Sequence, residues 1–240
     1  SKLKSSKKIS MLIAASAGNH AQGVALSAKK LKIKAIIVMP KTTPKIKIDA
    51  VRALKAQVIL FGDSYDDAYD FAKIKAKKEK IDFIHPYDDI DVIAGQGTIA
   101  LEIIEQLQKK PDYIFVPVGG GGLLAGITSY LKIESPKTKI IAVEPSDSDC
   151  FNQAFKARKR VKLKNIGIFA DGVAVKQIGK TTFDLTKDHV SSSLLISTDE
   201  ICAGIKDLYD ETRTIAEPAG ALSISGIKKF IKMHKIKNKS

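Results

Sequence analysis

Short apolar runs alternate with amphipathic stretches over most of the chain, and this alternation limits the fold more than any other feature. Residues 11–15 (MLIAA), 35–39 (AIIVM) and 58–61 (VILF) are apolar at every position instead of alternating between polar and apolar side chains. A strand that is apolar throughout is buried on both faces, and helices between such strands provide the cover. The sequence therefore predicts an α/β fold built on parallel sheets.

The expected elements follow one another along the chain. Strands are predicted at residues 11–15, 35–39, 58–61, 82–85, 113–118, 139–143, 167–170 and 193–197. Helices are predicted at residues 19–31, 44–54, 65–78, 97–108, 123–132, 151–159, 181–189, 199–213 and 218–234, with Thr198 as an N-cap. The stretch 86–97 separates two series of strand–helix units, so we expect two domains, residues 1–90 and 91–240.

The charge and cysteine content exclude several classes of protein. The 40 basic and 26 acidic residues give a net charge of +14, which raises nucleic-acid binding as a hypothesis. Only four of the basic residues are arginines and the lysines are spread along the chain, so we expect a solvated lysine-rich surface and no nucleic-acid partner. No apolar run has the length of a membrane span. Two cysteines cannot form a disulfide framework, which favours a reducing cytoplasm.

Four consecutive glycines, residues 119–122, lie between a predicted strand and a predicted helix. A run of glycines has a high conformational entropy cost, so it is favoured only where the backbone must approach something closely. Successive N–H groups at a helix N-terminus can surround an anion, and a phosphate is the expected ligand, with a purely steric turn as the alternative. Leu124 stands where the dinucleotide-binding pattern needs a third glycine, and the Gly-Lys-Ser/Thr of a Walker loop is absent.

Two further turns, residues 16–23 (SAGNHAQG) and 94–98 (AGQGT), are also predicted to lie between a strand and a helix. Ser16, Asn19, His20 and the backbone of Gly18 offer hydrogen-bond donors suited to a carboxylate, although a plain N-cap turn explains the first segment equally well. The same two interpretations apply to residues 94–98. Three anion-competent turns at the carboxyl ends of strands predict a crevice for a small molecule with a phosphate and a carboxylate.

Six segments in a fixed order carry a family resemblance. They are SAGNHAQG (16–23), AGQGT (94–98), PVGGGGLLAG (117–126), IAVEP (141–145), GIFADGVAV (167–175) and AEPAGAL (216–222). Together they resemble the threonine dehydratases (threonine ammonia-lyases) of the fold-type-II pyridoxal-phosphate (PLP) enzymes. The resemblance implies two open parallel-sheet, three-layer α/β domains of the tryptophan synthase β-like kind, with PLP in a cleft, and a homodimer or homotetramer.

The resemblance also implies roles for individual residues. The PLP phosphate would be held by Gly119, Gly120, Gly121, Gly122 and Leu123, and the ring hydroxyl by Asn19. The substrate carboxylate would be bound by the turn of Ser16, Ala17, Gly18, Asn19 and His20. The implied reaction is the loss of water from L-threonine to give 2-oxobutanoate and ammonia, with L-serine as a secondary substrate, in isoleucine biosynthesis or threonine catabolism.

Ala17 bears on which reaction is expected. Similar serine racemases place a serine hydroxyl at this position as a second proton donor, and a methyl group cannot deliver a proton. We therefore expect elimination in preference to racemisation. The alternatives are a serine racemase, a β-replacing synthase of the same fold, and a non-catalytic module that binds a phosphate ligand.

The chain also departs from the family pattern. The family's Schiff-base lysine lies in a Ser-Phe-Lys-x-Arg-Gly-Ala motif that this sequence lacks, and residues 155–158 (FKAR) follow the glycine run instead of preceding the Asn19 turn. The lysine is therefore expected upstream of Ser1, and the segment that supplies a partner for the pyridine nitrogen is expected after Ser240. On this interpretation the chain is a core fragment, truncated at both ends and inactive by itself.

No metal site is expected. Serine racemase-like relatives bind a divalent cation through two acids and a carbonyl, at positions that correspond here to Glu144, Cys150 and the carbonyl of Ser148. Cys150 puts a thiol where a carboxylate is needed, and a thiol serves the oxygen-preferring Mg²⁺ or Ca²⁺ poorly. The four histidines show no metal-ligand spacing.

Overall fold

The computed structural model describes residues 9–235 and divides between Asp89 and Ile90 into two compact units. The N-terminal unit comprises the described residues up to Asp89, and the C-terminal unit comprises those from Ile90 onward. The division lies within the stretch 86–97, where the sequence predicts a change of domain. Among the described residues, no helix has both the length and the apolar character needed to cross a membrane.

A four-stranded parallel sheet forms the centre of the N-terminal unit. Its strand order is β3 (Gln57–Leu60), β2 (Lys34–Met39), β1 (Met11–Ala15) and β4 (Asp82–Phe83). The helices are α1 (Asn19–Leu31), α2 (Lys45–Ala53) and α3 (Tyr65–Glu79). Because β1 has β2 on one side and β4 on the other, the order of strand addition reverses at β1. Such a switch point is where open α/β sheets bind ligands.

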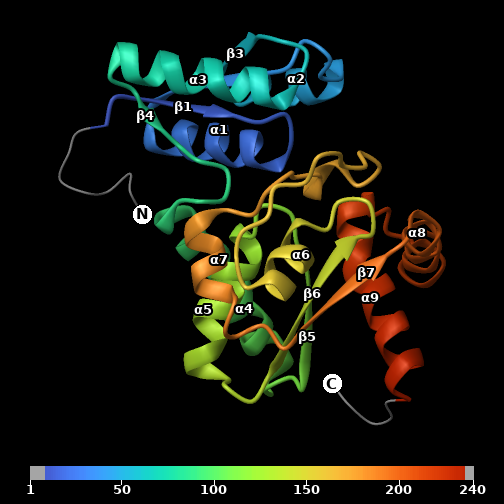
Figure 1. Cartoon of the computed structure of the whole chain (residues 1–240). Helices are drawn as coiled ribbons and strands as arrows, with labels where there is room; N and C mark the ends of the chain where they lie inside the picture. Colours follow the sequence, from blue (N-terminus) through green and yellow to red (C-terminus); the bar gives the residue numbers. More distant parts are fainter. Residues whose placement is uncertain (1–8, 236–240) are drawn as a thin grey trace. The chain divides into compact units, whose positions relative to one another are not determined.

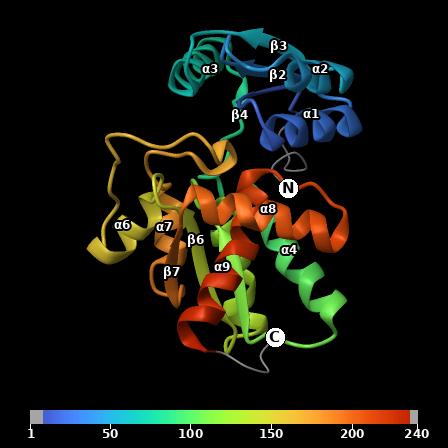
Figure 2. The ribbon, with the colours of Figure 1, turned by 90° about the vertical axis from the view of Figure 1, so that its right-hand side faces the viewer.

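The apolar strands explain why helices cover both faces of this sheet. Leu12 of β1 belongs to a buried cluster with α1 and α2, whereas Ile13 belongs to a cluster with α3. Figure 2 shows α3 on one side of the strands and α1 and α2 on the other. Each fully buried Leu or Ile contributes about 1.5–3 kcal/mol. Three alanines at a spacing of four residues, Ala68, Ala72 and Ala76, let α3 lie close to the sheet.

A three-stranded parallel sheet forms the centre of the C-terminal unit, in the order β5 (Tyr113–Pro117), β6 (Lys139–Pro145) and β7 (Ser192–Ile196). The helices are α4 (Ile90–Leu107), α5 (Gly122–Glu134), α6 (Cys150–Ala157), α7 (Lys180–Thr186), α8 (Thr198–Thr212) and α9 (Pro218–His234). A 3-10 turn spans Asp171–Val173. Figure 1 shows α5 and α7 on one side of the sheet and α8 and α9 on the other.

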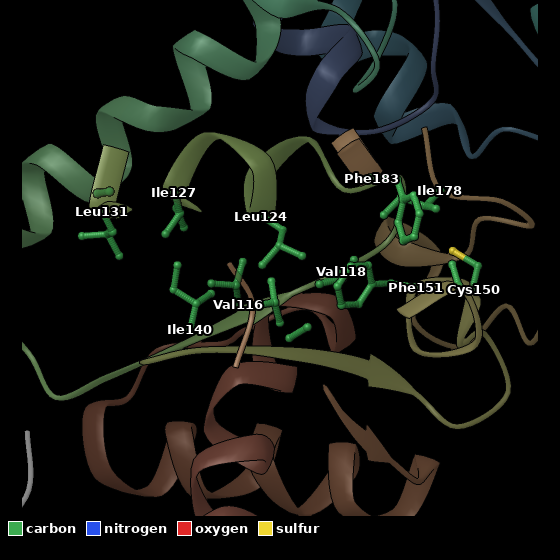
Figure 3. Packing of buried hydrophobic residues seen from close by; sticks show 14 of the residues in the cluster. Val116, Val118, Leu124, Ile127, Leu131, Ile140, Cys150, Phe151, Ile178 and Phe183 are labelled. Atoms are coloured by element: carbon green, nitrogen blue, oxygen red, sulfur yellow. The ribbon is translucent and has the colours of Figure 1, made fainter. Parts of the chain in front are cut away.

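The buried clusters of the C-terminal unit follow the same three layers. Leu124 of α5 and Phe183 of α7 lie in one cluster, and Ile201 of α8 and Leu222 of α9 lie in another on the opposite face. Figure 3 shows Cys150 at one end of the first cluster, to which Phe183 also belongs. The predicted α/β fold with two parallel sheets and three-layer units is therefore confirmed.

Three local predictions are wrong. The strand predicted at residues 167–170 is irregular backbone, in which the Gly167 N–H donates to the Asp147 carbonyl (2.8 Å). The helix predicted from residue 97 begins at Ile90 instead, because Gly95 and Gly97 are themselves part of the helix. The N-cap of α8 is Ser197 instead of Thr198, since the Ser197 hydroxyl accepts the Glu200 N–H (3.2 Å) and the Glu200 carboxylate accepts the Ser197 N–H (2.8 Å).

Candidate functional site

The glycine loop, residues 119–122, connects the carboxyl end of β5 to α5. Gly121 has φ +88°, in the left-handed region that side chains rarely adopt. A Cβ at Gly119 would lie 2.8 Å from the Cα of Val173, closer than side-chain atoms approach backbone. Glycine is therefore required at these two positions by conformation and by close packing.

The carbonyl groups of Gly119, Gly120 and Gly121 are held by other groups of the protein. The Gly119 carbonyl accepts from the Cys150 thiol (3.5 Å), the Gly120 carbonyl from the Thr182 hydroxyl (2.8 Å) and the Gly179 N–H (3.2 Å), and the Gly121 carbonyl from the Ala125 N–H (2.8 Å). In a trans peptide the C=O and the following N–H point in opposite directions, and the described chain has no cis peptide. The N–H groups of Gly120, Gly121 and Gly122 consequently point away from these partners.

The N–H groups of the loop have no acceptor in the part of the chain that the structure describes. Within residues 9–235, none of the N–H groups from Gly119 to Leu123 donates to a backbone or side-chain acceptor. The four glycines are buried, and a buried N–H without an acceptor is costly. These donors lie at the N-terminus of α5, where the helix dipole adds positive potential. The observation fits a bound phosphate group.

The turn between β1 and α1 carries the second set of donors. The Ser16 N–H donates to the Val38 carbonyl (3.1 Å), and the Gly18 N–H donates to the Ser16 hydroxyl (3.2 Å), which keeps its own proton for another acceptor. No side chain caps α1, and the N–H groups of His20 and Ala21 reach no carbonyl of the described chain. The turn lies at the switch point of the sheet, and its donors suit a carboxylate.

The His20 ring faces the protein. Its Nε2 is 3.4 Å from the Ile84 carbonyl, just after β4, and burial lowers the pKa of His20. A neutral ring that donates from Nε2 satisfies this carbonyl and joins the β1–α1 turn to the end of β4. Of the His20 groups, it is therefore the backbone N–H that is available at the α1 N-terminus.

His85 is a residue that the sequence analysis missed. Its Nδ1 accepts the N–H groups of Tyr87 (3.2 Å) and Asp88 (2.9 Å), and its ring makes edge contacts with Tyr69 and Phe83. Burial lowers the pKa of His85, which keeps Nδ1 free to accept. His85 thus fixes the backbone where β4 ends, beside the β1–α1 turn. The sequence indication is a lone histidine directly after a short strand.

Residues 94–98 are not an anion-binding turn, so that prediction is wrong. They form part of α4, and the Thr98 hydroxyl donates to the Gly95 carbonyl inside the helix (2.8 Å). Gly97 instead serves helix packing, because a Cβ on Gly126 of α5 would lie 2.6 Å from the Gly97 nitrogen and from the Ile93 carbonyl oxygen. Glycine at the crossing lets α4 and α5 approach backbone to backbone. Two of the three predicted anion turns remain.

Glu144 is buried and caps α6. Its two carboxyl oxygens accept the N–H groups of Phe151 (2.8 Å) and Asn152 (2.7 Å), while burial raises the pKa of Glu144 to about 8. Burial also raises the pKa of the Cys150 thiol, so Cys150 is protonated and a poor metal ligand. No group of three or more acidic, histidine or cysteine side chains in the described chain is arranged to hold a metal ion. The donor set therefore does not fit a divalent cation.

A cavity of about 470 Å³ in the C-terminal unit lies at the opposite end of the sheet from the glycine loop, where its lining includes Ile140 at the start of β6 and His189. Ligands of parallel α/β sheets bind at the carboxyl ends of the strands. The β1–α1 turn in the N-terminal unit and the glycine loop in the C-terminal unit, and not this cavity, are thus the two candidate ligand-binding segments.

A parallel α/β fold with a glycine loop at a helix N-terminus agrees with the family of pyridoxal-phosphate dependent enzymes, which the chain matches over residues 1–240. The chain belongs to this family. It is 50% identical over 238 residues to L-threonine dehydratase biosynthetic IlvA of Pasteurella multocida, covering 99% of this chain and 46% of that protein. The chain therefore spans less than half the length of this relative. The resemblance stated from the sequence is confirmed.

Solved structures give the same relationship. The processed form of threonine deaminase isoform 2 from Solanum lycopersicum has a TM-score of 0.94 and 47% identity, over 97% of this chain and 67% of that chain. Serine racemase from Dictyostelium discoideum has a TM-score of 0.85 and 30% identity, over 95% of this chain and 74% of that chain. The chain is thus more similar to the deaminase than to the racemase.

Proposed function

We propose that the protein containing this chain is a PLP-dependent threonine ammonia-lyase that converts L-threonine to 2-oxobutanoate and ammonia, with L-serine as a slower substrate. The choice of substrate is supported by the 50% identity to a threonine dehydratase over 99% of the chain. The choice of cofactor is supported by the family and by the buried N–H groups of the glycine loop, which have no acceptor in the described chain. The word "biosynthetic" in the relative's name favours a role in isoleucine biosynthesis.

In the C-terminal unit, the N–H groups of Gly119, Gly120, Gly121, Gly122 and Leu123 would hold the PLP phosphate. They provide hydrogen bonds and the positive end of the α5 dipole, which together favour a dianion. When bound, PLP supplies a conjugated ring that takes up the negative charge developing at the substrate Cα. The protein's part is to fix the position of that ring through its phosphate.

In the N-terminal unit, the turn of Ser16, Ala17, Gly18, Asn19 and His20 would bind the substrate carboxylate, and the Asn19 amide would bind the ring hydroxyl. The carboxylate would accept from the Ser16 hydroxyl and from the N–H groups at the start of α1, which reach no carbonyl of the described chain. Holding the carboxylate fixes the direction of the Cα–H bond, and that orientation is what proton removal requires.

Ala17 supports elimination in preference to racemisation. Inversion at Cα needs a proton donor on each face of the substrate, and the Ala17 methyl group has no proton to give. The lower identity to a serine racemase, 30% against 47% for the deaminase, agrees with this assignment.

Homo-oligomerisation, as a dimer or tetramer, is part of the proposal by analogy with the family. Both cysteines are free thiols, which favours a reducing compartment such as the cytoplasm.

The test uses the natural protein that contains this chain, supplied with PLP and L-threonine. We expect 2-oxobutanoate and ammonia in equal amounts, and slower formation of pyruvate from L-serine. Chiral analysis of the unreacted amino acid provides the second readout. If D-serine or D-allo-threonine accumulates as fast as the 2-oxoacid, the protein is a racemase and the proposal is wrong. Ala17→Ser should raise inversion at the expense of elimination.

A further inference from the structure

Two buried side chains hold the glycine loop from the side opposite to its free N–H groups. We propose that Cys150 and Thr182 are positioning residues that aim the loop N–H groups at the cofactor phosphate, and that Glu144 holds Cys150 in place through α6. The inference deepens the proposed function and rests on it, because that function assigns the loop to a phosphate.

Thr182 acts on the middle of the loop. Its side chain is fully buried, and its hydroxyl donates to the Gly120 carbonyl (2.8 Å). The peptide between Gly120 and Gly121 is planar and trans, so a fixed carbonyl direction also fixes the opposite direction of the Gly121 N–H. Gly179 supports the same carbonyl through its N–H (3.2 Å), but only Thr182 does so through a side chain that a substitution can remove.

Cys150 acts on the first peptide of the loop in the same way. Its thiol is fully buried and donates to the Gly119 carbonyl (3.5 Å), which fixes the direction of the Gly120 N–H. The thiol lies in the apolar cluster that also contains Phe151 and Phe183, as Figure 3 shows. In these surroundings it stays protonated, and only the protonated thiol can donate a hydrogen bond.

Glu144 sets the place of Cys150. Glu144 belongs to β6, and its carboxyl group accepts the N–H groups of Phe151 and Asn152, the two residues that follow Cys150 in α6. β6 is also joined to the residue just before the loop, because the Val118 N–H donates to the Val143 carbonyl (2.9 Å). One strand therefore positions both the beginning of α6 and the beginning of the loop.

At the start of α6, all four carboxyl oxygens of Glu144 and Asp149 accept hydrogen bonds from described residues. Both carboxyl oxygens of Glu144 accept backbone N–H groups, and both oxygens of Asp149 accept side-chain amides, from Asn152 (2.9 Å) and Gln153 (2.8 Å). A cation would have to compete with all four hydrogen bonds. We therefore expect the loop to keep its ligand affinity in the presence of EDTA.

The experiment compares PLP affinity, measured by equilibrium dialysis, in folded variants of the protein. Thr182→Val removes the hydroxyl at nearly constant volume and should weaken PLP binding about tenfold, the effect of one lost buried hydrogen bond. Thr186→Val is the matched control, because Thr186 is a buried threonine of the same helix whose hydroxyl donates to the Thr182 and Phe183 carbonyls of α7 and, in the described chain, not to the loop. We expect Thr186→Val to change the affinity less than twofold.

Cysteine variants provide the second comparison. Cys150→Ala should also weaken PLP binding several-fold. Cys150→Ser should recover most of the PLP affinity, because the serine hydroxyl can donate a hydrogen bond. Cys202 is exposed, so Cys202→Ala should leave the PLP affinity unchanged. Equal loss of affinity in Thr182→Val and Thr186→Val, or in Cys150→Ala and Cys150→Ser, would overturn the proposal. A loss on adding EDTA that Mg²⁺ restores would overturn the role given to Glu144.

Hydrogen exchange of the loop amides, measured without ligand by mass spectrometry, separates this inference from the proposed function. If the wild-type protein does not bind PLP, the proposed function fails. The positioning role then stands only if Thr182→Val and Cys150→Ala speed exchange across residues 116–124 while Thr186→Val does not. If exchange there is unchanged, the positioning role fails as well.

Discussion

Gly126→Ala tests the close approach of α4 and α5 that replaces the predicted turn at residues 94–98. The new Cβ would lie 2.6 Å from the Gly97 nitrogen and the Ile93 carbonyl oxygen, whereas ordinary contact begins at about 3.4 Å, so the two backbones must separate by about 0.8 Å. Overpacking of this kind costs about 1–3 kcal/mol, and the atoms concerned are backbone atoms that cannot rotate aside. For a domain of this size we expect the Tm to fall by about 3–10 °C.

Gly95→Ala is the matched control on the same segment. Nothing lies within 4 Å of a Cβ at Gly95, and the residue is exposed in the interior of α4. Alanine is more favourable than glycine in a helix by about 0.5–1 kcal/mol, so the Tm should rise by about 1–4 °C. The Tm of each variant is to be measured by thermal unfolding followed by circular dichroism. A lower Tm for Gly95→Ala, or an unchanged Tm for Gly126→Ala, would refute the helical packing described here.

Three further predictions concern buried groups and the loop. Because burial places the folded-state pKa of Glu144 near 8, above the ordinary value of 4.5, its stabilising contribution is present at low pH and is lost as the pH rises towards 8. Urea titrations give the unfolding free energies of the wild type and of Glu144→Gln. The wild type should exceed the variant by less at pH 8.5 than at pH 5.5, and a larger difference at pH 8.5 would contradict this expectation. The pKa of His85 is lowered, so its contribution has the opposite sign and is lost as the pH falls below 6.5. The wild type should lose more stability than His85→Asn between pH 7.5 and pH 5.5, and an equal loss in both would contradict the assignment. Gly119→Ala brings a Cβ to 2.8 Å from the Val173 Cα, so the loop must move, and PLP binding should weaken at least tenfold. The control Gly95→Ala should leave PLP binding unchanged. Equal PLP affinities of the two variants would show that the loop binds PLP in spite of the added Cβ.

Local patterns predicted the elements whose causes are local. The run MLIAA is buried on both faces and forms β1 over the predicted residues, and the helix predicted at 218–234 is α9, with Pro218 at its first turn. The glycine loop was also predictable, because a glycine run between a strand and a helix has few other uses.

Long-range causes could not be predicted in this way. From the sequence alone, Gly97 is predicted to be a turn residue. The structure shows that it contacts Gly126, a residue of another helix. Thr182 acts on a carbonyl 62 residues away and Cys150 on one 31 residues away, and neither position has a sequence pattern that marks it. The sequence therefore predicts the groups that would contact the ligand, while the residues that hold those groups are visible only in the fold.

Under the proposed function, a phosphate-binding loop made only of glycine has a consequence for protein engineering. The loop has no side chain that could be exchanged to change its affinity for an anion, and Gly119 and Gly121 do not accept a Cβ without strain. Adjustable affinity has to come from the layer behind the loop, at positions such as Cys150 and Thr182. Libraries that vary this supporting layer, and leave the glycines untouched, are the ones in which graded cofactor affinities should be found.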